Sequence, residues 1–137
     1  MKIKLMADST CDLSKEILNR YNICLAPLVI SIEGKEYKDR IDISNDEFYR
    51  NLMTFKTYPT TSMPSPESYI ACIQNAIEQG YENILCICMS SGTSGSYQSA
   101  LLAKELFYEQ NPKSNITFEV IDSVSMSHGS GWLIMKC

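Results

Sequence analysis

Residue patterns that bind metal are scarce in this sequence. His128 is the single histidine among 137 residues, and it has no partner at zinc-finger spacing. No two cysteines stand in a Cys-x-x-Cys pair, so neither a zinc ribbon nor a thioredoxin-type motif is present. We therefore expect no bound metal and no cofactor. The cysteines are interpreted as reduced thiols that pack as small apolar side chains. They are Cys11, Cys24, Cys72, Cys86, Cys88 and Cys137.

Basic runs and long apolar runs are also absent. Lys and Arg number 12 against 16 Asp and Glu, for a formal net charge of -4, and the basic residues are scattered. Because nucleic-acid-binding domains usually carry a clustered basic face, this balance argues against nucleic acid as a partner. No apolar stretch is long enough to cross a bilayer, and no signal-peptide core follows the first residues. We expect a cytoplasmic protein without a transmembrane segment.

Internal repeats and low-complexity segments are missing as well, and the composition is that of one folded domain. The apolar fraction is 45% and the charged fraction 20%, and 137 residues fit the usual size of a single domain. Apolar runs typical of strands alternate with helical patterns, which favours βαβ units. The sequence therefore predicts the α/β class, with a mostly parallel sheet flanked by helices on both faces. Strands are expected at residues 3–7, 23–32, 37–38, 84–89 and 116–121.

Capping residues predict where several helices begin. Ser44 opens a Ser-x-x-Glu capping box, and Ser65 precedes a proline, which is favoured in a first helical turn. Gly80 is expected to end the helix that follows Ser65. Either Thr10 or Asp12 is expected to cap an earlier helix over residues 13–21. Further helices are predicted from residue 97 to about residue 108, and from residue 132 onward.

Local turn residues qualify the second and third predicted strands. Pro27 lies inside the 23–32 run and indicates an edge strand or a bulge there. Residues 33–36 read Glu-Gly-Lys-Glu, which is typical of a hairpin turn into the short strand at 37–38.

Four polar loops separate the predicted elements, at residues 8–12, 60–65, 90–96 and 122–131. At least three of them follow strands, so right-handed crossovers should bring them to one edge of the sheet. Residues 90–96 read Ser-Ser-Gly-Thr-Ser-Gly-Ser and join an apolar strand to a helix. Ligands of open α/β sheets bind at such corners, and the free N–H groups of a first helical turn attract anions. The loop therefore predicts a site for a small anion or a carboxylate.

The residues alone leave several interpretations of this loop open. Local helix capping would explain its serines and glycines. The loop lacks the lysine of a P-loop and the glycine spacing of a dinucleotide fingerprint, but a small phosphate-binding module remains possible. Residues 92–96 also approximate the Gly-x-Ser-x-Gly nucleophile elbow, with Asp122 and His128 following in α/β-hydrolase order. A serine esterase that uses Ser94 is thus an alternative.

Four segments together resemble the DegV family of bacterial lipid-binding proteins. They stand in family order over the whole chain: Asp8-Ser9-Thr10-Cys11-Asp12-Leu13, Thr61-Ser62-Met63-Pro64-Ser65-Pro66-Glu67, residues 90–100, and Ile121-Asp122-Ser123 with Ser127-x-Gly129-x-Gly131. The family usually has Gln at the position of Met63 and Leu at that of Thr93. Neither departure removes a hydroxyl group expected to bind ligand.

The resemblance implies a protein that binds one long-chain fatty acid and has no catalytic activity of its own. In the family, the carboxylate is held by the threonine of the Thr-Ser-x-Pro-Ser motif and by the serine of a Ser-Gly pair after a strand. Carried over, these are Thr61 and Ser94, with Ser62 and the Gly95 N–H group as neighbours. Some members present the carboxylate to a fatty acid kinase for acyl-phosphate formation, so such a kinase subunit is an expected partner.

The resemblance also implies a domain organisation. Family members are about twice as long and bind the fatty acid between two domains, the second of which adds His or Arg contacts to the carboxylate. Residues 1–137 are therefore expected to be a DegV-like N-terminal α/β domain, truncated relative to the family, with the second domain absent. We expect weak fatty-acid binding by this part alone. We also expect self-association through the apolar surface that a second domain would cover.

Overall fold

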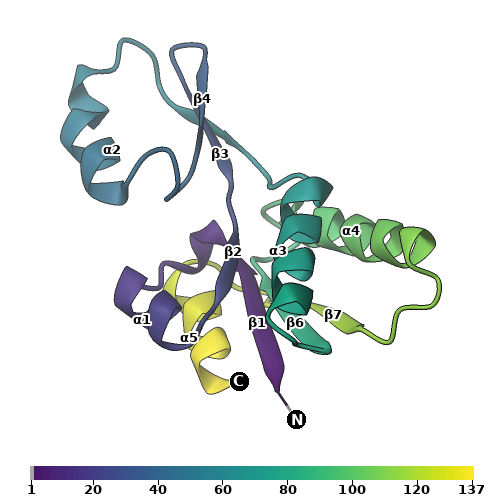
Figure 1. Cartoon of the computed structure of the whole chain (residues 1–137). Helices are drawn as coiled ribbons and strands as arrows, with labels where there is room; N and C mark the ends of the chain where they lie inside the picture. The colour runs from purple at the N-terminus through teal and green to yellow at the C-terminus, as the bar shows by residue number, and fades with distance from the viewer. Residues whose placement is uncertain (1) are drawn as a thin grey trace.

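The computed structural model describes residues 2–137, which form five α-helices, two short 3₁₀ helices and seven strands (Figure 1). The strands are β1 (Ile3–Asp8), β2 (Cys24–Ala26), β3 (Val29–Ile32), β4 (Lys35–Lys38), β5 (Thr60–Ser62), β6 (Asn83–Cys88) and β7 (Thr117–Asp122). The helices are η1 (Ser9–Cys11), α1 (Lys15–Arg20), α2 (Asn45–Asn51), η2 (Leu52–Thr54), α3 (Pro66–Glu78), α4 (Ser96–Gln110) and α5 (His128–Lys136).

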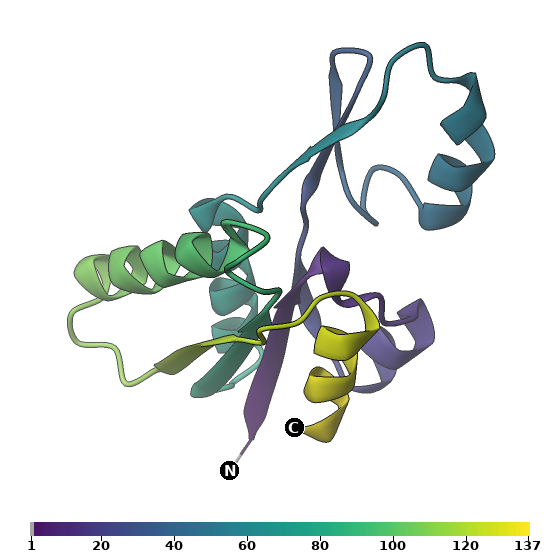
Figure 2. The same ribbon diagram turned by 180° about the vertical axis from the view of Figure 1, so that it is seen from behind.

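The main sheet is parallel, with strand order β2-β1-β6-β7. Helices α3 and α4 pack on one face of it, and α1 and α5 lie on the other (Figures 1 and 2). The predicted α/β class, with a parallel sheet between two helical layers, is confirmed. None of the helices within residues 2–137 combines the length and apolar character that a membrane crossing requires.

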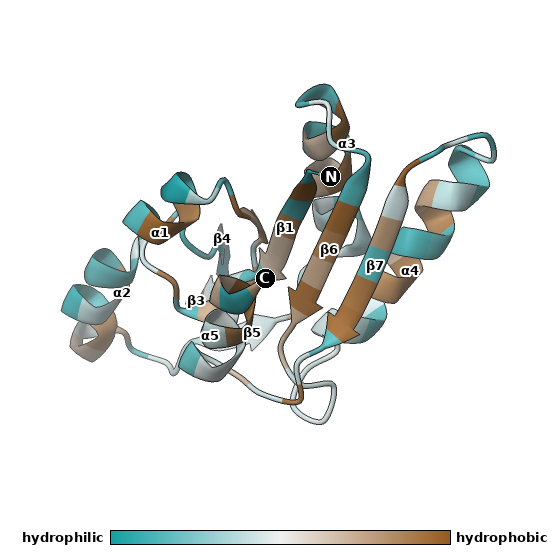
Figure 3. Cartoon of the chain, turned by 90° about the horizontal axis from the view of Figure 1, so that it is seen from below, coloured by the Kyte–Doolittle hydropathy of each residue, from teal (hydrophilic) through white to brown (hydrophobic). Residues whose placement is uncertain are grey.

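Alternation along the strands builds a separate apolar layer on each face of the main sheet. In β6, Cys86 and Cys88 point toward α3 and α4, whereas Ile87 points toward α5. Both cysteines are fully buried, as predicted, and their Sγ atoms lie 3.6 Å apart. Apolar residues dominate the length of β6 in Figure 3, where β1, β6 and β7 run in the same direction. This buried frame positions the carboxyl ends of three strands side by side.

A second, antiparallel sheet with strand order β4-β3-β5 stands beyond the carboxyl ends of the main strands, together with α2 (Figure 1). We call residues 29–62 the arm. The single predicted strand at 23–32 is wrong, because the run divides at Pro27 into β2 of the main sheet and β3 of the arm. Proline has no N–H group to donate to a strand ladder, so the chain can change sheets there.

The predicted hairpin turn in the arm is confirmed, but β4 begins at Lys35 rather than at residue 37. The last strand of the arm was expected to be a loop. Glu33 and Gly34 have φ angles of 50° and 80°, as the two-residue turn between β3 and β4 requires. Residues 60–62, predicted as part of a polar loop, instead form β5 and pair with β3. The exposed threonines and serine of β5 are compatible with a strand at the sheet edge.

Two predicted helix starts are confirmed. The Oγ atom of Ser44 accepts the Glu47 N–H group at 3.2 Å, and the Oγ atom of Ser65 accepts the Ser68 N–H group at 3.4 Å. Gly80 follows the second of these helices with a φ of 77°. These caps act within one turn, which is why the sequence predicts them.

Two other predicted helix starts are wrong. The first helix is capped by Ser14 rather than by Thr10 or Asp12. The carboxylate of Asp8 instead accepts the Thr10 N–H group, which bends the chain after β1 into η1. The last helix begins at His128, earlier than residue 132, so that Gly129 and Gly131 lie inside it.

Gly131 permits the close approach of α5 to η1. A Cβ atom at this position would overlap the backbone carbonyl oxygen of Cys11 and lie 3.2 Å from Leu13 Cδ2. We expect Gly131→Ala to lower the free energy of unfolding by about 1–3 kcal/mol, because backbone cannot move aside as a side chain can. Chemical denaturation measures this loss. Gly129→Ala is the control, since its Cβ meets only the Ser125 side chain. Equal stability of the two variants would contradict the close-packing argument.

Candidate functional site

The carboxyl ends of β1 and β6 lie side by side at the point where the chain order of the main sheet reverses. From β1 the chain passes through α1 to β2 on one side, and it later returns through α3 to β6 on the other. Ligands of open α/β sheets bind at such a crevice. The carboxylate of Asp8, the last residue of β1, links the two strand ends. One of its oxygens accepts the N–H group of Met89, after β6, at 2.7 Å, and the other accepts the Thr10 N–H group at 3.1 Å.

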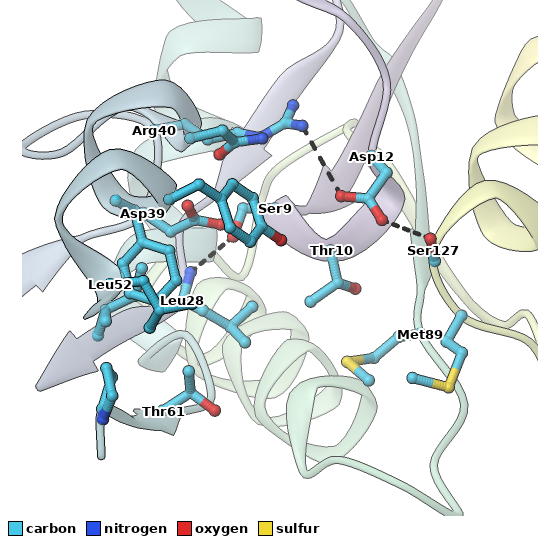
Figure 4. Close-up of a pocket in the computed structure, with 16 residues that line it drawn as sticks. Ser9, Thr10, Asp12, Leu28, Asp39, Arg40, Leu52, Thr61, Met89 and Ser127 are labelled. Atoms are coloured by element: carbon cyan, nitrogen blue, oxygen red, sulfur yellow. Dashed lines mark hydrogen bonds and ion pairs between the residues drawn. The ribbon is translucent and has the colours of Figure 1, made fainter. Parts of the chain in front are cut away.

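A pocket of about 460 Å³ lies between this edge of the main sheet and the arm (Figure 4). Its volume falls within the range of about 300–1,000 Å³ that is usual for small-molecule sites. One part of the lining is apolar. Ile30, Phe48 and Leu52 belong to the arm, Leu28 lies just before it, and Met89 and Met126 lie in the loops after β6 and β7. The other part is polar: Ser9, Thr10, Asp12, Asp39, Arg40, Thr61 and Ser127. The pocket is therefore suited to a ligand with a long apolar portion and a polar end.

Most hydroxyl groups of the lining are already bonded to the protein. The Ser9 Oγ atom accepts the Leu28 N–H group at 3.0 Å, the Thr10 hydroxyl donates to Asp8, and the Ser127 hydroxyl donates to Asp12. The Thr61 hydroxyl forms no hydrogen bond with any of residues 2–137. Of the four serine and threonine hydroxyl groups of the lining, that of Thr61 is the one free to donate to a ligand.

The charged groups of the lining neutralise one another in part. Arg40 donates from Nη1 to the Leu13 carbonyl oxygen at 2.6 Å, and its Nη2 lies 3.9 Å from Asp12 Oδ1. Burial raises the pKa of Asp39 above its ordinary value, although a Ser9 hydrogen bond and the Arg40 charge oppose that rise. Arg40 and Asp12 lie apart from Thr61 in Figure 4. An anion near Thr61 would therefore be bound by neutral donors rather than by this arginine.

The four residues predicted to bind the carboxylate occupy different positions. Thr61 lines the pocket opposite Ile30 of β3, while Ser62, Ser94 and Gly95 are not part of the lining. Because successive residues of a strand point to opposite faces, the side chain of Ser62 lies on the other face of β5 from Thr61.

Contacts between β5 and α4 nevertheless bring the two predicted motifs together. A Cβ atom at Gly95 would overlap the Met63 sulfur, so the residue after β5 packs directly on the start of α4. One turn later, the Ser99 hydroxyl donates to the Pro64 carbonyl oxygen at 2.6 Å. The expected convergence of the 60–65 and 90–96 segments is thus present in the structure.

The first turn of α4 retains donors for an anion. Gly95, the residue before this helix, has no side chain that could cap the helix, in contrast to the serine caps of α1, α2 and α3. The Ser94 Oγ atom lies 2.9 Å from Ser96 Oγ and accepts the Ser96 N–H group at 3.1 Å. A helix of this length attracts negative charge to its N-terminal turn.

The remainder of the 90–96 loop bonds internally. The Thr93 and Ser94 N–H groups both donate to the Ser90 carbonyl oxygen, at 3.0 and 3.1 Å. Asp122 at the end of β7 accepts the Ser91 and Val124 N–H groups at 3.2 and 2.9 Å. The Ser91 hydroxyl and the Val124 N–H group lower the pKa of the Asp122 carboxyl below its ordinary value. Asp122 therefore stabilises the loop conformation.

The three residues of the esterase alternative are not joined by hydrogen bonds among residues 2–137. The Ser94 hydroxyl pairs with Ser96, whereas the nearest polar partner of His128 Nδ1 is Ser127 Oγ at 3.2 Å. Asp122 accepts backbone N–H groups of loops. His128 and Asp122 therefore do not form a hydrogen-bonded triad with Ser94 in this structure. Within residues 2–137, no group of three or more His, Cys, Asp or Glu side chains is placed to hold a metal ion.

Sequence reasoning missed the contribution of the arm to the pocket. The capping box at Ser44 correctly indicated α2, but no local signal places Phe48 and Leu52 over the edge of the main sheet. The link between Arg40 and Asp12 was missed for the same reason, since these residues are distant in the sequence. In the structure, the backbones of Arg40 and Asp12 both have positive φ angles, 64° and 52°.

Comparison with known proteins associates this fold with one family. The family model described as "Uncharacterised protein, DegV family" matches residues 2–137. A DegV domain-containing protein of Clostridium acetobutylicum is 36% identical over 135 residues, which are 98% of this chain and 46% of that protein. The chain thus spans about half the length of the curated relatives it matches.

Solved structures give the same result. A fatty acid (stearic acid)-binding protein from Eubacterium ventriosum superposes with a TM-score of 0.89 at 37% identity, over 98% of this chain and 46% of that one. The Fatty Acid Kinase (Fak) B3 protein of Streptococcus pneumoniae, loaded with linoleic acid, superposes with a TM-score of 0.78 at 26% identity. That match covers 99% of this chain and 47% of the other.

Proposed function

The chain belongs to the DegV family, and we propose that its pocket binds a long-chain fatty acid through the carboxylate. The observation that carries the proposal is the position of Thr61. Its unbonded hydroxyl enters a pocket of about 460 Å³ that is also lined by apolar side chains, both from the arm and from the loops after β6 and β7. One protein of the same fold is named a stearic acid-binding protein, and another was solved loaded with linoleic acid, which supports this ligand class.

The proposed carboxylate position lies between Thr61 and the first turn of α4. Thr61 would donate its hydroxyl hydrogen, and Ser94 and the Gly95 N–H group would complete the donor set. The contact between Met63 and Gly95 supports this, because it holds the two segments against each other. Neutral donors at a helix N-terminus stabilise a carboxylate without a full counter-charge. Ser62 would act by orienting Thr61 in β5 rather than by contact from its own side chain.

The apolar part of the ligand would lie along the arm. Phe48 and Leu52 from α2 and η2, together with Leu28 and Met89, offer a surface that contains no charge. Each buried CH₂ group contributes about 0.8 kcal/mol, so a long acyl chain gains far more from this wall than a short acid does. A small phosphate would gain nothing from it.

We propose a carrier role rather than a catalytic one, in which the bound carboxylate is presented to a fatty acid kinase for acyl-phosphate formation. The likeness to a protein named for a fatty acid kinase supports this partner. A carboxylate held by neutral donors keeps its negative charge and can act as a nucleophile toward a phosphoryl group. The Asp12 and Arg40 pair at the far side of the pocket leaves that charge unpaired.

Lipid extraction followed by mass spectrometry tests the function. Purified protein should release long-chain fatty acids, both as the 137-residue chain and as a chain of the relatives' length that contains it. The loaded protein should then yield acyl phosphate when it is mixed with a purified fatty acid kinase and ATP. If neither protein released acyl chains, the proposal that the pocket binds fatty acid would be wrong. If acyl chains were released but no acyl phosphate formed, the proposed kinase partner would be wrong.

A further inference from the structure

A buried lysine lies on the main sheet, away from the pocket. Lys4 of β1 is 2% exposed, its Nζ donates to Gln79 Oε1 at 3.0 Å, and it lies 5.4 Å from the centroid of the Tyr81 ring. Within residues 2–137, no carboxylate is within ion-pair distance of Lys4. Burying a cation without a counter-charge costs free energy, so the groups that face Lys4 must stabilise its charge.

Two cysteines face this lysine. Lys4 and Met6 lie on the same side of β1, and Met6 pairs with Cys24 in the β1–β2 register, so Cys24 lies on that side too. Helix α3 covers this side and contributes Cys72, whose Sγ donates to the Leu25 carbonyl oxygen at 3.5 Å. The register and the helix packing therefore bring both thiols and the ammonium group into one space.

The surroundings of the two thiols shift their acidities in opposite directions. The neighbouring Cys72 thiol lowers the pKa of Cys24, and the Lys4 charge lowers it further, against the effect of burial. The neighbouring Cys24 thiol, together with burial, raises the pKa of Cys72. Cys24 is half-buried, and Cys72 is 5% exposed. Cys24 is thus the more reachable thiol and the better nucleophile of the pair.

We propose that Cys24 and Cys72 form a redox site, at which a peroxide oxidises the two thiols to a disulfide. The Cys24 thiolate attacks one peroxide oxygen, the O–O bond breaks, and the hydroxide that leaves takes a proton to become water. Cys24 is then a sulfenic acid. The Cys72 sulfur attacks the Cys24 sulfur, the S–O bond breaks, and the Cys72 proton leaves with a second water. The peroxide receives the two electrons that the thiols lose.

The other cysteines lack this combination of partner and access. Cys86 and Cys88 lie close together, but neither has exposed surface for an oxidant to reach. Cys11 is buried, and burial raises the pKa of its thiol. Cys137 is exposed at the last residue of the chain and has no thiol beside it among residues 2–137.

The position of the pair gives the disulfide a structural effect. The arm joins the main sheet through two connections, one after β2 and one before α3. Cys24 lies in β2 and Cys72 lies in α3, so a bond between them closes a ring that contains the whole arm. Closing a long loop removes entropy from the unfolded chain. The oxidised form should therefore melt higher, by roughly 5–10 °C.

The test uses the Cys137→Ser chain, which removes the exposed thiol. After treatment with hydrogen peroxide, free thiols are alkylated in denaturant and the protein is digested without reductant. Mass spectrometry should find the Cys24 and Cys72 peptides joined and two hydrogens lighter than the free pair. A reductant should release them and reverse the rise in Tm. Recovery of both cysteines alkylated, or separately oxidised to sulfinic acids, would overturn the proposal.

The role of Lys4 is tested by the rate of the same reaction. Lys4→Met keeps the apolar stem and removes the charge, and it should slow the oxidation of Cys24 by about 3- to 10-fold. Lys2→Met is the control, because Lys2 is exposed and should leave the rate unchanged. Equal rates in the two variants, with native circular dichroism spectra, would remove Lys4 from the site. The joined peptide in the Cys137→Ser chain tests the thiol pair independently of either lysine variant.

Discussion

Replacing Thr61 with valine is expected to weaken laurate binding by about 10- to 100-fold. Valine has nearly the shape of threonine, so the change removes the hydroxyl group and little else. A hydrogen bond to a charged group is worth about 1.5–3 kcal/mol, and 1.4 kcal/mol corresponds to a factor of ten in affinity. The Thr61 hydroxyl has no other partner among residues 2–137, so its full contribution should go to the ligand. Titration calorimetry with laurate measures the difference.

The neighbouring threonine provides a matched control. Thr60 belongs to the same strand and is exposed, but its side chain lies on the opposite face of β5 from Thr61. Thr60→Val should bind laurate as the unmodified chain does. Valine is favourable in strands, so both variants should keep the fold. If the two variants bound laurate equally, the carboxylate would not be at Thr61.

Replacing Asp8 with asparagine is expected to lower the free energy of unfolding by about 2–4 kcal/mol. Asp8 is 1% exposed, and its two oxygens accept N–H groups from Met89 and Thr10. Asparagine offers one oxygen and one NH₂ group, so one of those donors would face another donor in a buried site. Urea denaturation followed by circular dichroism measures the change.

Asp122 provides the comparison for Asp8. It too is the last residue of a strand in the main sheet, and it accepts two backbone N–H groups, but it lies nearer the surface. Water can replace a lost acceptor there, so Asp122→Asn should cost much less stability. A loss as large as that of Asp8→Asn would show that burial is not what makes Asp8 important. The comparison thus separates burial from hydrogen-bond number.

Secondary structure was predictable wherever its cause is local. The apolar runs of β1, β6 and β7 and the serine caps at Ser44 and Ser65 act within a few residues, and each was recognised. The start of α1 was not, because two competing caps lay nearby and the Asp8 carboxylate was engaged by Thr10 and Met89. The cap that forms, from Ser14 to the Ile17 N–H group, is itself local and was overlooked, whereas the bond between Asp8 and the distant Met89 could not be read from neighbouring residues.

The candidate site was predictable only in outline. The family resemblance brought the 60–65 and 90–96 segments to one carboxylate, and the contact of Met63 with Gly95 agrees with their proximity. The pocket itself did not follow, since Ile30, Phe48 and Leu52 of its apolar lining come from the arm. The residue motifs treated Thr61 and Ser62 as neighbours in one site, whereas a strand directs them to opposite faces. Whether residues 60–62 are loop or strand depends on the pairing with β3.

The thiol pair illustrates the same limit. Cys24, Cys72 and Lys4 form no motif, and the sequence supports only the general expectation of buried, reduced cysteines. Their juxtaposition depends on the β1–β2 register and on the packing of α3 across it. Both are contacts between segments far apart in the chain.

By itself, the sequence determined the α/β class, the parallel strands, the helix caps at Ser44 and Ser65 and the family resemblance. These depend on hydrophobic periodicity and on hydrogen bonds that span at most one turn. Only the tertiary structure decided that Pro27 separates two sheets, that the arm closes the pocket and that Thr61 carries its free hydroxyl. Those features depend on which segments, distant in the sequence, pack against one another, and on which polar groups are then left without a hydrogen-bond partner. Neither is determined until the chain has folded.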